Sequence, residues 1–476
     1  MDTASPIGNS LQSQLAHLQQ LAALQPPDYA TRRQWLAGLA SIVTEHQQEW
    51  IDALQADFGC RSAVETRLAE LFPSLEGIRL AQRKLAGWMR VQRRGLSFWF
   101  WPAKARVQPQ PLGVAGIIVP WNYPVFLALG PLSSALAAGN RAMVKMSELS
   151  PHSGALLQKL CRQYLGDDVV QVVNGDVSVA QAFAALPFDH LLFTGSTRVG
   201  RSVMQAAAAN LTPVTLELGG KSPALIAPGF DMRRVVGSLV AGKMLNAGQT
   251  CVAPDYVLVH EDDREALLAE LRRQAALAYP DPAANPDYTA IINQAHFDRL
   301  QRWRDEAAQL GARVEVLAAG SSEAALNAAR KLPLTLIENA PAHSMVMREE
   351  IFGPLLPIIT YDKTGNALAY INSRDRPLAL YLYDDNRCRI GKVLQGSMAG
   401  GVSINDTLMH VVQDQLPFGG VGPSGMGHYH GYEGFVTFSK MKPVFYQSRF
   451  SGAALTQPPH GKLVQWLLNL MLGRVK

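Results

Sequence analysis

The sequence predicts an α/β fold with parallel sheets, because two long stretches of the chain alternate short apolar strands with helices. The first stretch starts at Val114, and each of its strands leads into turn residues and a helical pattern. The second stretch starts near Ser222 and alternates in the same way. Such alternation is typical of βαβ units, whose strands run parallel. The expected strands are 114–119, 141–144, 169–173 and 190–193, then 224–226, 256–259, 314–317, 334–337 and 355–360.

Three other segments have different patterns. Residues 10–95 are expected to be mostly helical, because apolar residues recur there at spacings of three and four. Residues 98–107 begin with four aromatic side chains and predict an exposed strand-like ribbon, for which a partner subunit is one candidate cover. Residues 463–472 fit an amphipathic helix that, at about 15 Å, is too short to span a bilayer. Packing on the protein's own surface, a lid over a substrate tunnel and a membrane-surface contact all remain open for this helix.

Composition and charge limit the class of protein. The chain has 476 residues, of which 48% are hydrophobic and 17% charged, so it can bury a large core in roughly two to four domains. The formal charge is +5, and the one dense basic cluster, residues 83–94, fits a solvated helix face better than nucleic-acid binding. The four cysteines form no CxxC pair or zinc-ligand spacing. We therefore expect reduced thiols in a cytoplasmic protein without a bound metal.

A glycine turn between a strand and a helix is the candidate phosphate site. The run Gly195-Ser196-Thr197-Arg198-Val199-Gly200 follows residues 191–194 and precedes a helix that begins at Arg201. Such a turn directs backbone N–H groups and the positive helix end at a phosphate. The run reads GxxxxG and lacks the middle glycine of GxGxxG. An ordinary turn therefore remains an alternative, and a pyrophosphate would be met differently from a standard Rossmann site.

Three further residues carry groups suited to covalent catalysis. Cys251 follows Asn246–Thr250, a turn-like setting that allows the exposure a reactive thiol needs, although an isolated cysteine is more often a small buried hydrophobe. Glu217 precedes two glycines at a strand end and can serve as a general base, or simply form a salt bridge. Asn122 lies between two prolines and can donate to an oxyanion, or form an Asx turn.

Taken together, these motifs resemble the aldehyde dehydrogenases over nearly the whole chain, in that family's order. The continuation Cys251–Tyr256 and the short N-terminus look like the class 3 branch. The segment 414–430 looks most like bacterial coniferyl aldehyde dehydrogenases. The matching blocks are Pro120–Pro124, Lys145–Glu148, Phe193–Thr197, Glu217–Pro223, Asn246–Cys251 and Glu349–Pro354.

The resemblance implies a role for each candidate residue. Cys251 would be the nucleophile and Glu217 the general base, and Asn122 would form the oxyanion hole with the backbone N–H of Cys251. Glu148 would accept hydrogen bonds from the adenosine ribose and repel a 2′-phosphate, which favours NAD+, although class 3 relatives also use NADP+. The glycine turn would meet the phosphates, Lys145 and Glu350 the riboses, and Phe352 the nicotinamide ribose. The residues implied to bind the cofactor are Lys145, Glu148, Gly195, Ser196, Gly200, Glu350 and Phe352.

The resemblance also implies a domain organisation. We expect a Rossmann-type NAD(P)-binding domain from residues 1–96 and 112–217, and an α/β catalytic domain from 218–412. A small β element from 97–111 and 413–450 would form the oligomerisation ribbon of a homodimer. Residues 451–476 would be a C-terminal tail that carries the amphipathic helix.

The implied reaction is NAD(P)+-dependent oxidation of an aldehyde to the carboxylic acid, through a thiohemiacetal and a thioester on Cys251. The substrate would be an aryl aldehyde such as coniferyl aldehyde, or a medium-chain aliphatic one. A CoA-acylating dehydrogenase is an alternative, but it needs no base for hydrolysis, and Glu217 offers one. A thiol hydrolase is a second alternative, but no histidine follows Cys251 closely before His260.

Overall fold

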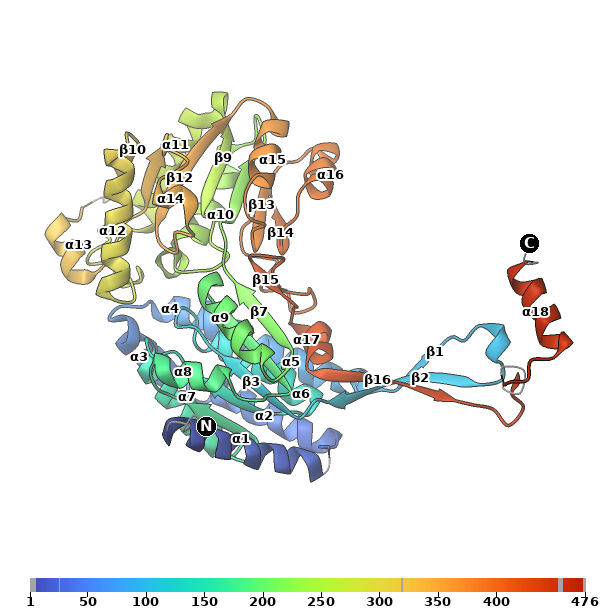
Figure 1. Ribbon diagram of the computed structural model, residues 1–476. Coiled ribbons are helices and arrows are strands. Elements are labelled where there is room, and N and C mark those ends of the chain that lie inside the picture. The colour runs from blue at the N-terminus through green and yellow to red at the C-terminus, as the bar shows by residue number, and fades with distance from the viewer. Residues whose placement is uncertain (1–5, 25, 318–319, 453–456, 474–476) are drawn as a thin grey trace.

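The computed structural model describes residues 6–24, 26–317, 320–452 and 457–473. Figure 1 shows two α/β units, one above the other, and a narrow ribbon that extends sideways from the lower unit. The start of the expected N-terminal domain, residues 1–5, and parts of the expected C-terminal tail, residues 453–456 and 474–476, lie outside the described residues.

The lower unit is built on a six-stranded sheet with the order β15-β7-β6-β3-β4-β5. All neighbours are parallel except β15, which is antiparallel to β7. Its strands are almost wholly buried, as parallel strands covered by helices on both faces should be. The four strands expected here are confirmed to within two residues. The elements are β3 (Val114–Ile118), α6 (Phe126–Ala138), β4 (Arg141–Lys145), α7 (Pro151–Tyr164), β5 (Val170–Val173), α8 (Val177–Ala184), β6 (His190–Gly195), α9 (Thr197–Ala208), β7 (Val214–Leu218) and β15 (Gly425–Met426).

The N-terminal helices pack against this sheet. α1 contacts α8, β3 and β4, while α2 and α5 pack on each other and on α6. The expectation of a mostly helical region is confirmed as far as Trp88. It is wrong for Gln92–Arg94, which forms strand β1 because it pairs antiparallel with β2. The elements are α1 (Pro6–Leu24), α2 (Tyr29–Thr44), α3 (Gln47–Phe58), α4 (Ala63–Thr66), the π-helix η1 (Arg67–Leu71), α5 (Phe72–Trp88) and β1 (Gln92–Arg94).

The upper unit holds a seven-stranded sheet with the order β10-β11-β12-β9-β8-β13-β14. Only β10 is antiparallel to its neighbour. The five strands expected here are confirmed to within one residue, and β13 and β14 extend the sheet beyond them. The elements are β8 (Pro223–Ile226), α10 (Met232–Met244), η3 (Leu245–Gly248), β9 (Tyr256–His260), η4 (Glu261–Asp263), α11 (Arg264–Ala278), α12 (Gln294–Gln309), β10 (Arg313–Val316), α13 (Glu323–Ala329), β11 (Thr335–Glu338), α14 (Met345–Arg348), β12 (Leu355–Tyr361), α15 (Thr364–Asn372), β13 (Ala379–Tyr383), α16 (Arg387–Gly396) and β14 (Gly401–Ile404).

The ribbon is a three-stranded antiparallel sheet with the order β1-β2-β16. Its strand β2 begins at Lys104, and Phe98–Phe100 forms a short 3-10 helix (η2) instead of the expected strand. Helix α18 lies at the far end of the ribbon (Figure 1), and none of its residues is buried, so it does not pack on the rest of the chain. In the described part of the chain, no helix is long and apolar enough to cross a membrane. The elements are β2 (Lys104–Pro111), α17 (Gly431–Thr437), β16 (Ser439–Tyr446) and α18 (Lys462–Leu472).

One buried side chain joins the ribbon to the lower unit. The side-chain oxygen Oδ1 of Asn140 accepts hydrogen bonds from the backbone N–H groups of Leu112 and Gly113, at 2.7 and 2.9 Å. Its amide nitrogen donates to the carbonyls of Ala135 and Phe438, at 3.1 and 2.8 Å. The side chain therefore ties the end of β2, the last turn of α6 and the start of β16 to one point.

We expect Asn140→Ala to lower the free energy of unfolding by about 2–4 kcal/mol, because it leaves buried backbone groups without partners. Urea or thermal unfolding of the full chain measures the loss. The matched control is Asn210→Ala, which removes one exposed hydrogen bond to Ala185 and should change stability by no more than about 0.5 kcal/mol. Equal stability of the two variants would contradict a stabilising role of the Asn140 side chain between the ribbon and the lower unit.

Candidate active site

Cys251 follows a tight left-handed turn at the end of α10. Asn246 and Ala247 have φ angles of 53° and 54°, and Gly248 has a φ of 74°. A Cβ atom at position 248 would lie 2.5 Å from the carbonyl oxygen of Gly353, so the turn requires glycine there. Left-handed conformations at non-glycine residues persist only where the surroundings hold them. The turn places Cys251 where an apolar pocket and a wider polar cleft meet, since it lines both.

Buried hydrogen bonds hold this turn. The backbone N–H of Asn246 donates to the Glu65 carboxylate at 3.2 and 3.3 Å, and Thr289 Oγ1 donates to the same carboxylate at 2.7 Å. Asn246 Nδ2 donates to the carbonyl oxygen of Asn122 at 3.0 Å. Burial raises the pKa of Glu65, and the Thr289 hydrogen bond and the Arg61 charge partly oppose that rise.

Asn122 lies beside the Cys251 loop. It follows β3 and is buried, with 3% of its surface exposed. Its Nδ2 donates to the carbonyl oxygen of Gln249 at 3.1 Å, two residues before the cysteine. Asn122 and Cys251 also line the same polar cleft. An amide donor therefore stands near the thiol, as an oxyanion hole requires.

Glu217 is a carboxylic acid held in an apolar setting. It lies in β7 between Thr194 of β6 and Gly425 of β15, and only 2% of it is exposed. Neither carboxyl oxygen has a hydrogen-bond partner among the described residues. Burial raises the pKa of Glu217 well above its ordinary value. Burial thus favours the neutral form of the carboxyl group and makes its anion a stronger base, which suits a general base.

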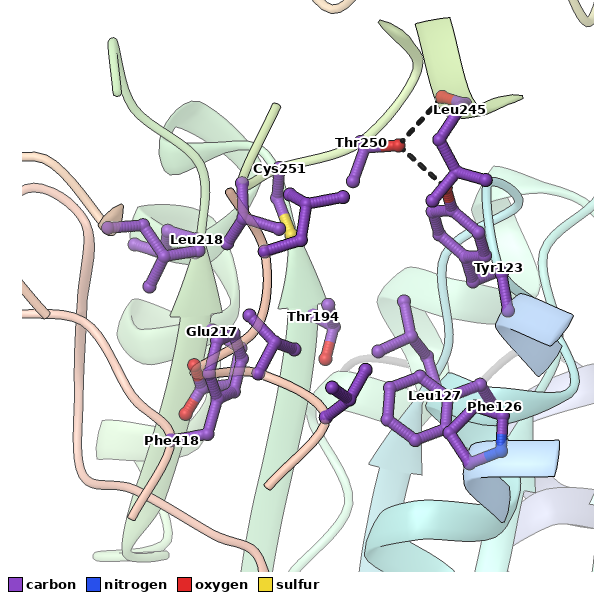
Figure 2. A pocket seen from close by; sticks show the side chains of 17 residues that line it. Tyr123, Phe126, Leu127, Thr194, Glu217, Leu218, Leu245, Thr250, Cys251 and Phe418 are labelled. Carbon is purple, nitrogen blue, oxygen red and sulfur yellow. Dashed lines mark hydrogen bonds between the residues drawn. The ribbon is translucent and has the colours of Figure 1, made fainter. Parts of the chain in front are cut away.

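The thiol of Cys251 is also held neutral. Burial raises its pKa to about 12, and the charges of Glu350 and Glu217 add to the rise. Cys251 and Glu217 line the apolar pocket together, and the sulfur points toward its middle (Figure 2). Thr194 lines the same pocket. The other described cysteines, Cys60, Cys161 and Cys388, do not line it.

The pocket beyond the thiol is almost entirely hydrophobic. Tyr123 and Phe418 both line it. The Tyr123 hydroxyl and Thr250 Oγ1 share a hydrogen bond of 2.7 Å, so the polar end of the tyrosine already has a partner. A ring or an alkyl chain fits such walls better than a charged group does. The remaining apolar lining comes from Ala69, Pro73, Phe126, Leu127, Leu218, Leu245, Val252, Leu378, Leu408, Val411 and Val412.

The polar cleft on the other side of Cys251 receives the start of helix α9. Gly195 and Ser196 line the cleft, and Ser196 is the N-cap of α9, accepting a bond from the N–H of Val199 at 3.4 Å. The positive end of a helix and its free N–H groups form a binding place for an anion. Arg198 and Arg201 line the same cleft and add positive charge. A dinucleotide phosphate fits this combination.

Glu350 and Phe352, on the loop between α14 and β12, also line the cleft. Lys221 holds that loop by donating to the carbonyls of Val346 and Glu349, at 2.7 and 2.9 Å, and by an ion pair with Asp255. A Cβ atom at position 219 would lie 2.0 Å from Glu350 Oε2, so glycine is needed beside the carboxyl group. Burial raises the pKa of Glu350 to about 8, and its Oε1 has no described partner. That free oxygen can accept a hydrogen bond from a ribose hydroxyl.

The other three residues expected at the cofactor do not line the cleft. Lys145 ends β4, is buried, and donates to the carbonyls of Met146 and Gly175 at 2.7 and 2.9 Å. Glu148 follows on the exposed loop after β4. Gly200 is buried inside α9, where a Cβ atom would lie 2.6 Å from Leu218. Its absence of a side chain therefore lets the helix approach β7.

Sequence reasoning missed most of the cationic residues of the cleft. Arg198 stood inside a recognised motif without a role of its own, and the others come from separate helices and loops. No local motif marks them, because only the fold brings them together. The arginines of this set are Arg201, Arg299, Arg348, Arg374 and Arg376, and the aromatic rings of His296 and Trp303 line the same cleft.

A thiol, a buried carboxyl group and an amide donor thus meet where an apolar pocket joins a polar cleft, an arrangement that suits covalent catalysis beside a bound dinucleotide. The sequence profile of the aldehyde dehydrogenase family matches residues 16–444. The chain belongs to the aldehyde dehydrogenase family, and the resemblance noted from its motifs is confirmed. It is an enzyme that oxidises aldehydes to carboxylic acids.

Individual relatives cover nearly the whole chain. A probable coniferyl aldehyde dehydrogenase of Pseudomonas aeruginosa is 50% identical, over 98% of this chain and 97% of that protein. A coniferyl aldehyde dehydrogenase of a Pseudomonas species is 43% identical, over 99% and 97%. The structure of substrate-bound AldH of Staphylococcus aureus matches with a TM-score of 0.91 and 34% identity, over 97% and 99% of the two chains.

The fold also agrees with a nicotinamide cofactor. The structure of PnpE in complex with nicotinamide adenine dinucleotide matches with a TM-score of 0.84 and 25% identity, over 93% of this chain and 90% of that one. Together with the family and the anion-binding cleft, this likeness supports a nicotinamide dinucleotide as the cofactor.

The raised pKa of Cys251 predicts how its reactivity depends on pH. In the cofactor-free enzyme, alkylation of Cys251 by iodoacetamide should accelerate about tenfold per pH unit across the neutral range, because only the thiolate reacts. Glu350→Gln should leave the rate unchanged well below pH 8, where Glu350 is protonated. It should raise the rate above pH 8, where it removes a negative charge near the sulfur.

Peptide mapping after alkylation isolates the signal of Cys251 from those of Cys60 and Cys388, which are partly or fully exposed. Cys251→Ser provides the blank. A Cys251 rate that levels off below pH 8 would contradict a neutral resting thiol.

Proposed function

We propose that this enzyme oxidises an aryl aldehyde of the coniferyl type to its carboxylic acid, with Cys251 as the nucleophile. The observation that carries the proposal is the mostly apolar pocket that Cys251 and Glu217 line together, with aromatic walls at Phe126 and Phe418. The coniferyl aldehyde dehydrogenases among the relatives support the same substrate class. Medium-chain aliphatic aldehydes are the second class that such walls admit.

The first chemical step belongs to Cys251 and Asn122. The thiolate adds to the aldehyde carbon, and the carbonyl oxygen becomes an alkoxide. Asn122 Nδ2 and the backbone N–H of Cys251 donate to that oxygen, and one such hydrogen bond can contribute about 3 kcal/mol to the transition state. A neutral aldehyde does not release hydride, whereas the alkoxide can, so the covalent adduct is what makes oxidation feasible. When bound, the nicotinamide supplies the acceptor for that hydride.

Glu217 acts on the thioester that remains on Cys251. Its carboxyl group lines the same pocket and has no competing partner among the described residues. The raised pKa makes it a stronger base than an exposed glutamate once it is ionised. It takes a proton from water, the resulting hydroxide adds to the thioester carbon, and the acid leaves as the thiol is restored.

For the cofactor we propose NAD+ in preference to NADP+. Glu148 follows β4 on an exposed loop, where its carboxylate can accept from ribose hydroxyls and would repel a 2′-phosphate. Gly195, Ser196 and the start of α9 would hold the phosphates. Glu350 would bind the nicotinamide ribose, with Phe352 packed beside it. Lys145 donates two of its three ammonium N–H bonds to the carbonyls of Met146 and Gly175, and the third would donate to the adenosine ribose.

The two alternative reactions fit less well. A CoA-acylating enzyme would not need Glu217 buried beside the thiol. A thiol hydrolase needs a histidine bonded to the sulfur, and the described residues give Cys251 no such bond. For the assembly we propose a homodimer in the cytoplasm, with residues 97–111 and 413–450 as its oligomerisation ribbon, and domains of 1–96 with 112–217 and of 218–412.

The division of labour between Cys251 and Glu217 can be tested by rapid kinetics. Glu217→Gln should still release about one equivalent of NADH in a burst, then turn over at least 100-fold more slowly, because acylation survives and hydrolysis fails. Cys251→Ser is the control and should give neither burst nor turnover. If Glu217→Gln turned over steadily at nearly the rate of the unaltered enzyme, Glu217 would not be the general base.

The substrate class can be tested by NADH formation over a panel of aldehydes. We expect kcat/KM to be highest for coniferyl and cinnamyl aldehydes, lower for hexanal and octanal, and higher with NAD+ than with NADP+. The same panel with and without CoA separates hydrolysis from acyl transfer. A requirement for CoA, or a clear preference for short polar aldehydes, would overturn the proposal.

A further inference from the structure

The loop between α14 and β12 is held at its backbone from two directions. The N–H of Ile351 donates to Asp255 Oδ2 at 2.8 Å, and the carbonyl oxygen of Ile351 accepts from Arg299 Nη2 at 2.9 Å. The Ile351 side chain itself is fully buried. Its neighbours in the chain, Glu350 and Phe352, both line the polar cleft. The two hydrogen bonds of Ile351 therefore fix where those side chains lie.

Asp255 joins this loop to the residues that carry the chemistry. It follows Cys251 closely in the chain, and only 3% of it is exposed. Its second carboxylate oxygen, Oδ1, forms an ion pair with Lys221, which follows Glu217 closely. Lys221 also donates to the carbonyl oxygen of Glu349 in the same loop. The ion pair thus ties the chain after the proposed nucleophile and the chain after the proposed base to one loop.

We propose that Asp255 is a positioning residue that sets the affinity of the enzyme for its dinucleotide cofactor. The inference rests on the proposed function, in which Glu350 and Phe352 meet the nicotinamide ribose. Asp255 does not itself line the cleft, so it acts through the backbone of the loop. Together with Lys221 it holds the ribose site in a fixed place relative to the thiol. A displacement of about 1 Å in such a site can cost about 100-fold in rate.

The same ion pair also sets the charge around Glu350. Burial is the main cause of the raised pKa of Glu350, and the charge of Asp255 raises that pKa further. The charges of Lys221 and Arg299 lower it. Lys243 of α10 is buried as well and lies within electrostatic reach of both Glu350 and Asp255. Because Asp255 and Lys221 act on the pKa of Glu350 with opposite signs, replacing one or the other has opposite effects on it.

Binding of NADH to the cofactor-free enzyme tests the proposal without turnover. Quenching of tryptophan fluorescence measures the Kd, since Trp121 and Trp303 line the cleft. Asp255→Asn keeps the size of the side chain but loses the ion pair, and we expect the Kd for NADH to rise about tenfold or more. Charge alone predicts a lower Kd, because NADH is an anion with an uncharged nicotinamide and the substitution removes a negative charge. An unchanged or lower Kd would overturn the proposal.

Asp384→Asn is the matched control. Asp384 is also buried, forms an ion pair with Arg389 and accepts from the backbone N–H of Asn386 at 2.7 Å. Those partners belong to the start of α16 and not to the loop between α14 and β12. The Kd for NADH should stay within about twofold of the unaltered value. An equal rise in both variants would assign the effect to a general loss of stability and overturn the proposal.

Glu350→Ala separates this inference from the proposed function. If the Kd for NADH does not change in Glu350→Ala, Glu350 does not bind the ribose, and the cofactor contact in the proposed function fails. If the Kd rises in Glu350→Ala but not in Asp255→Asn, the contact stands and only the role of Asp255 is overturned.

Alkylation of Cys251 by iodoacetamide gives a readout that a loss of packing alone would not move. The charge of Glu350 raises the pKa of Cys251, so the pH at which Glu350→Gln starts to accelerate alkylation reports the pKa of Glu350, about 8 in the unaltered enzyme. In the Asp255→Asn background that pH should fall, and in the Lys221→Gln background it should rise. Shifts of the same sign, or none, would overturn the proposal. Lys221→Gln removes the same ion pair from its other end, so it provides this test even where Asp255→Asn does not fold.

Discussion

The carbonyl oxygen of Asn122 is the point on which the active site depends. It accepts hydrogen bonds from Arg61 Nη1 at 2.9 Å and from Asn246 Nδ2 at 3.0 Å. The first bond ties the loop after β3 to the N-terminal helices, and the second ties it to the turn before Cys251. Three segments that are far apart in the sequence therefore meet at one oxygen. A shift of one segment against another would change the position of the Asn122 amide relative to the Cys251 thiol.

Buried charges make this junction rigid as well as specific. Arg61 and Glu70 form an ion pair at 3.1 Å with neither side chain exposed, and Glu70 Oε2 also accepts from the N–H groups of Val125 and Phe126. Burial raises the pKa of Glu70 to about 7, against the effect of Arg61. Removing one member of such a pair is costly, because the other charge is left buried without compensation. The start of α6 and the Asn122 loop are thus fixed relative to helix η1.

Much of the site could be predicted from the sequence, because its reacting groups sit in local motifs. Asn122 and Glu217 end or follow strands of one parallel sheet, so the fold class alone predicts that they meet at one edge. Cys251 could be recognised by the turn before it. Their supports could not be predicted in the same way. Arg61 lies on the loop between α3 and α4, Glu65 on α4 and Glu70 on the π-helix η1, and only the packing of these segments shows which charges face the site.

The fold was predicted best where burial enforces a pattern and least where it does not. The strands of the two parallel sheets are buried on both faces, so their apolar runs stand out within one or two residues. Gln92–Arg94 is polar and mostly exposed, and pairing with β2 decides its conformation more than its own side chains do. Gly200 shows a related limit, because a glycine needed for close packing against Leu218 and one needed to meet a phosphate look the same in a motif.

The site gains its chemistry from keeping its acids uncharged until they are needed. Cys251, Glu217 and Glu350 each have a raised pKa, and burial is the main cause for all three. Burial thus disfavours the charged forms of all three groups, which as anions would repel one another and draw in water. The apolar pocket is stable beside them for that reason. In the reaction proposed above, ionising the thiol for addition or Glu217 for hydrolysis is easiest while the other groups stay protonated, so the same burial would separate the two proton transfers in time.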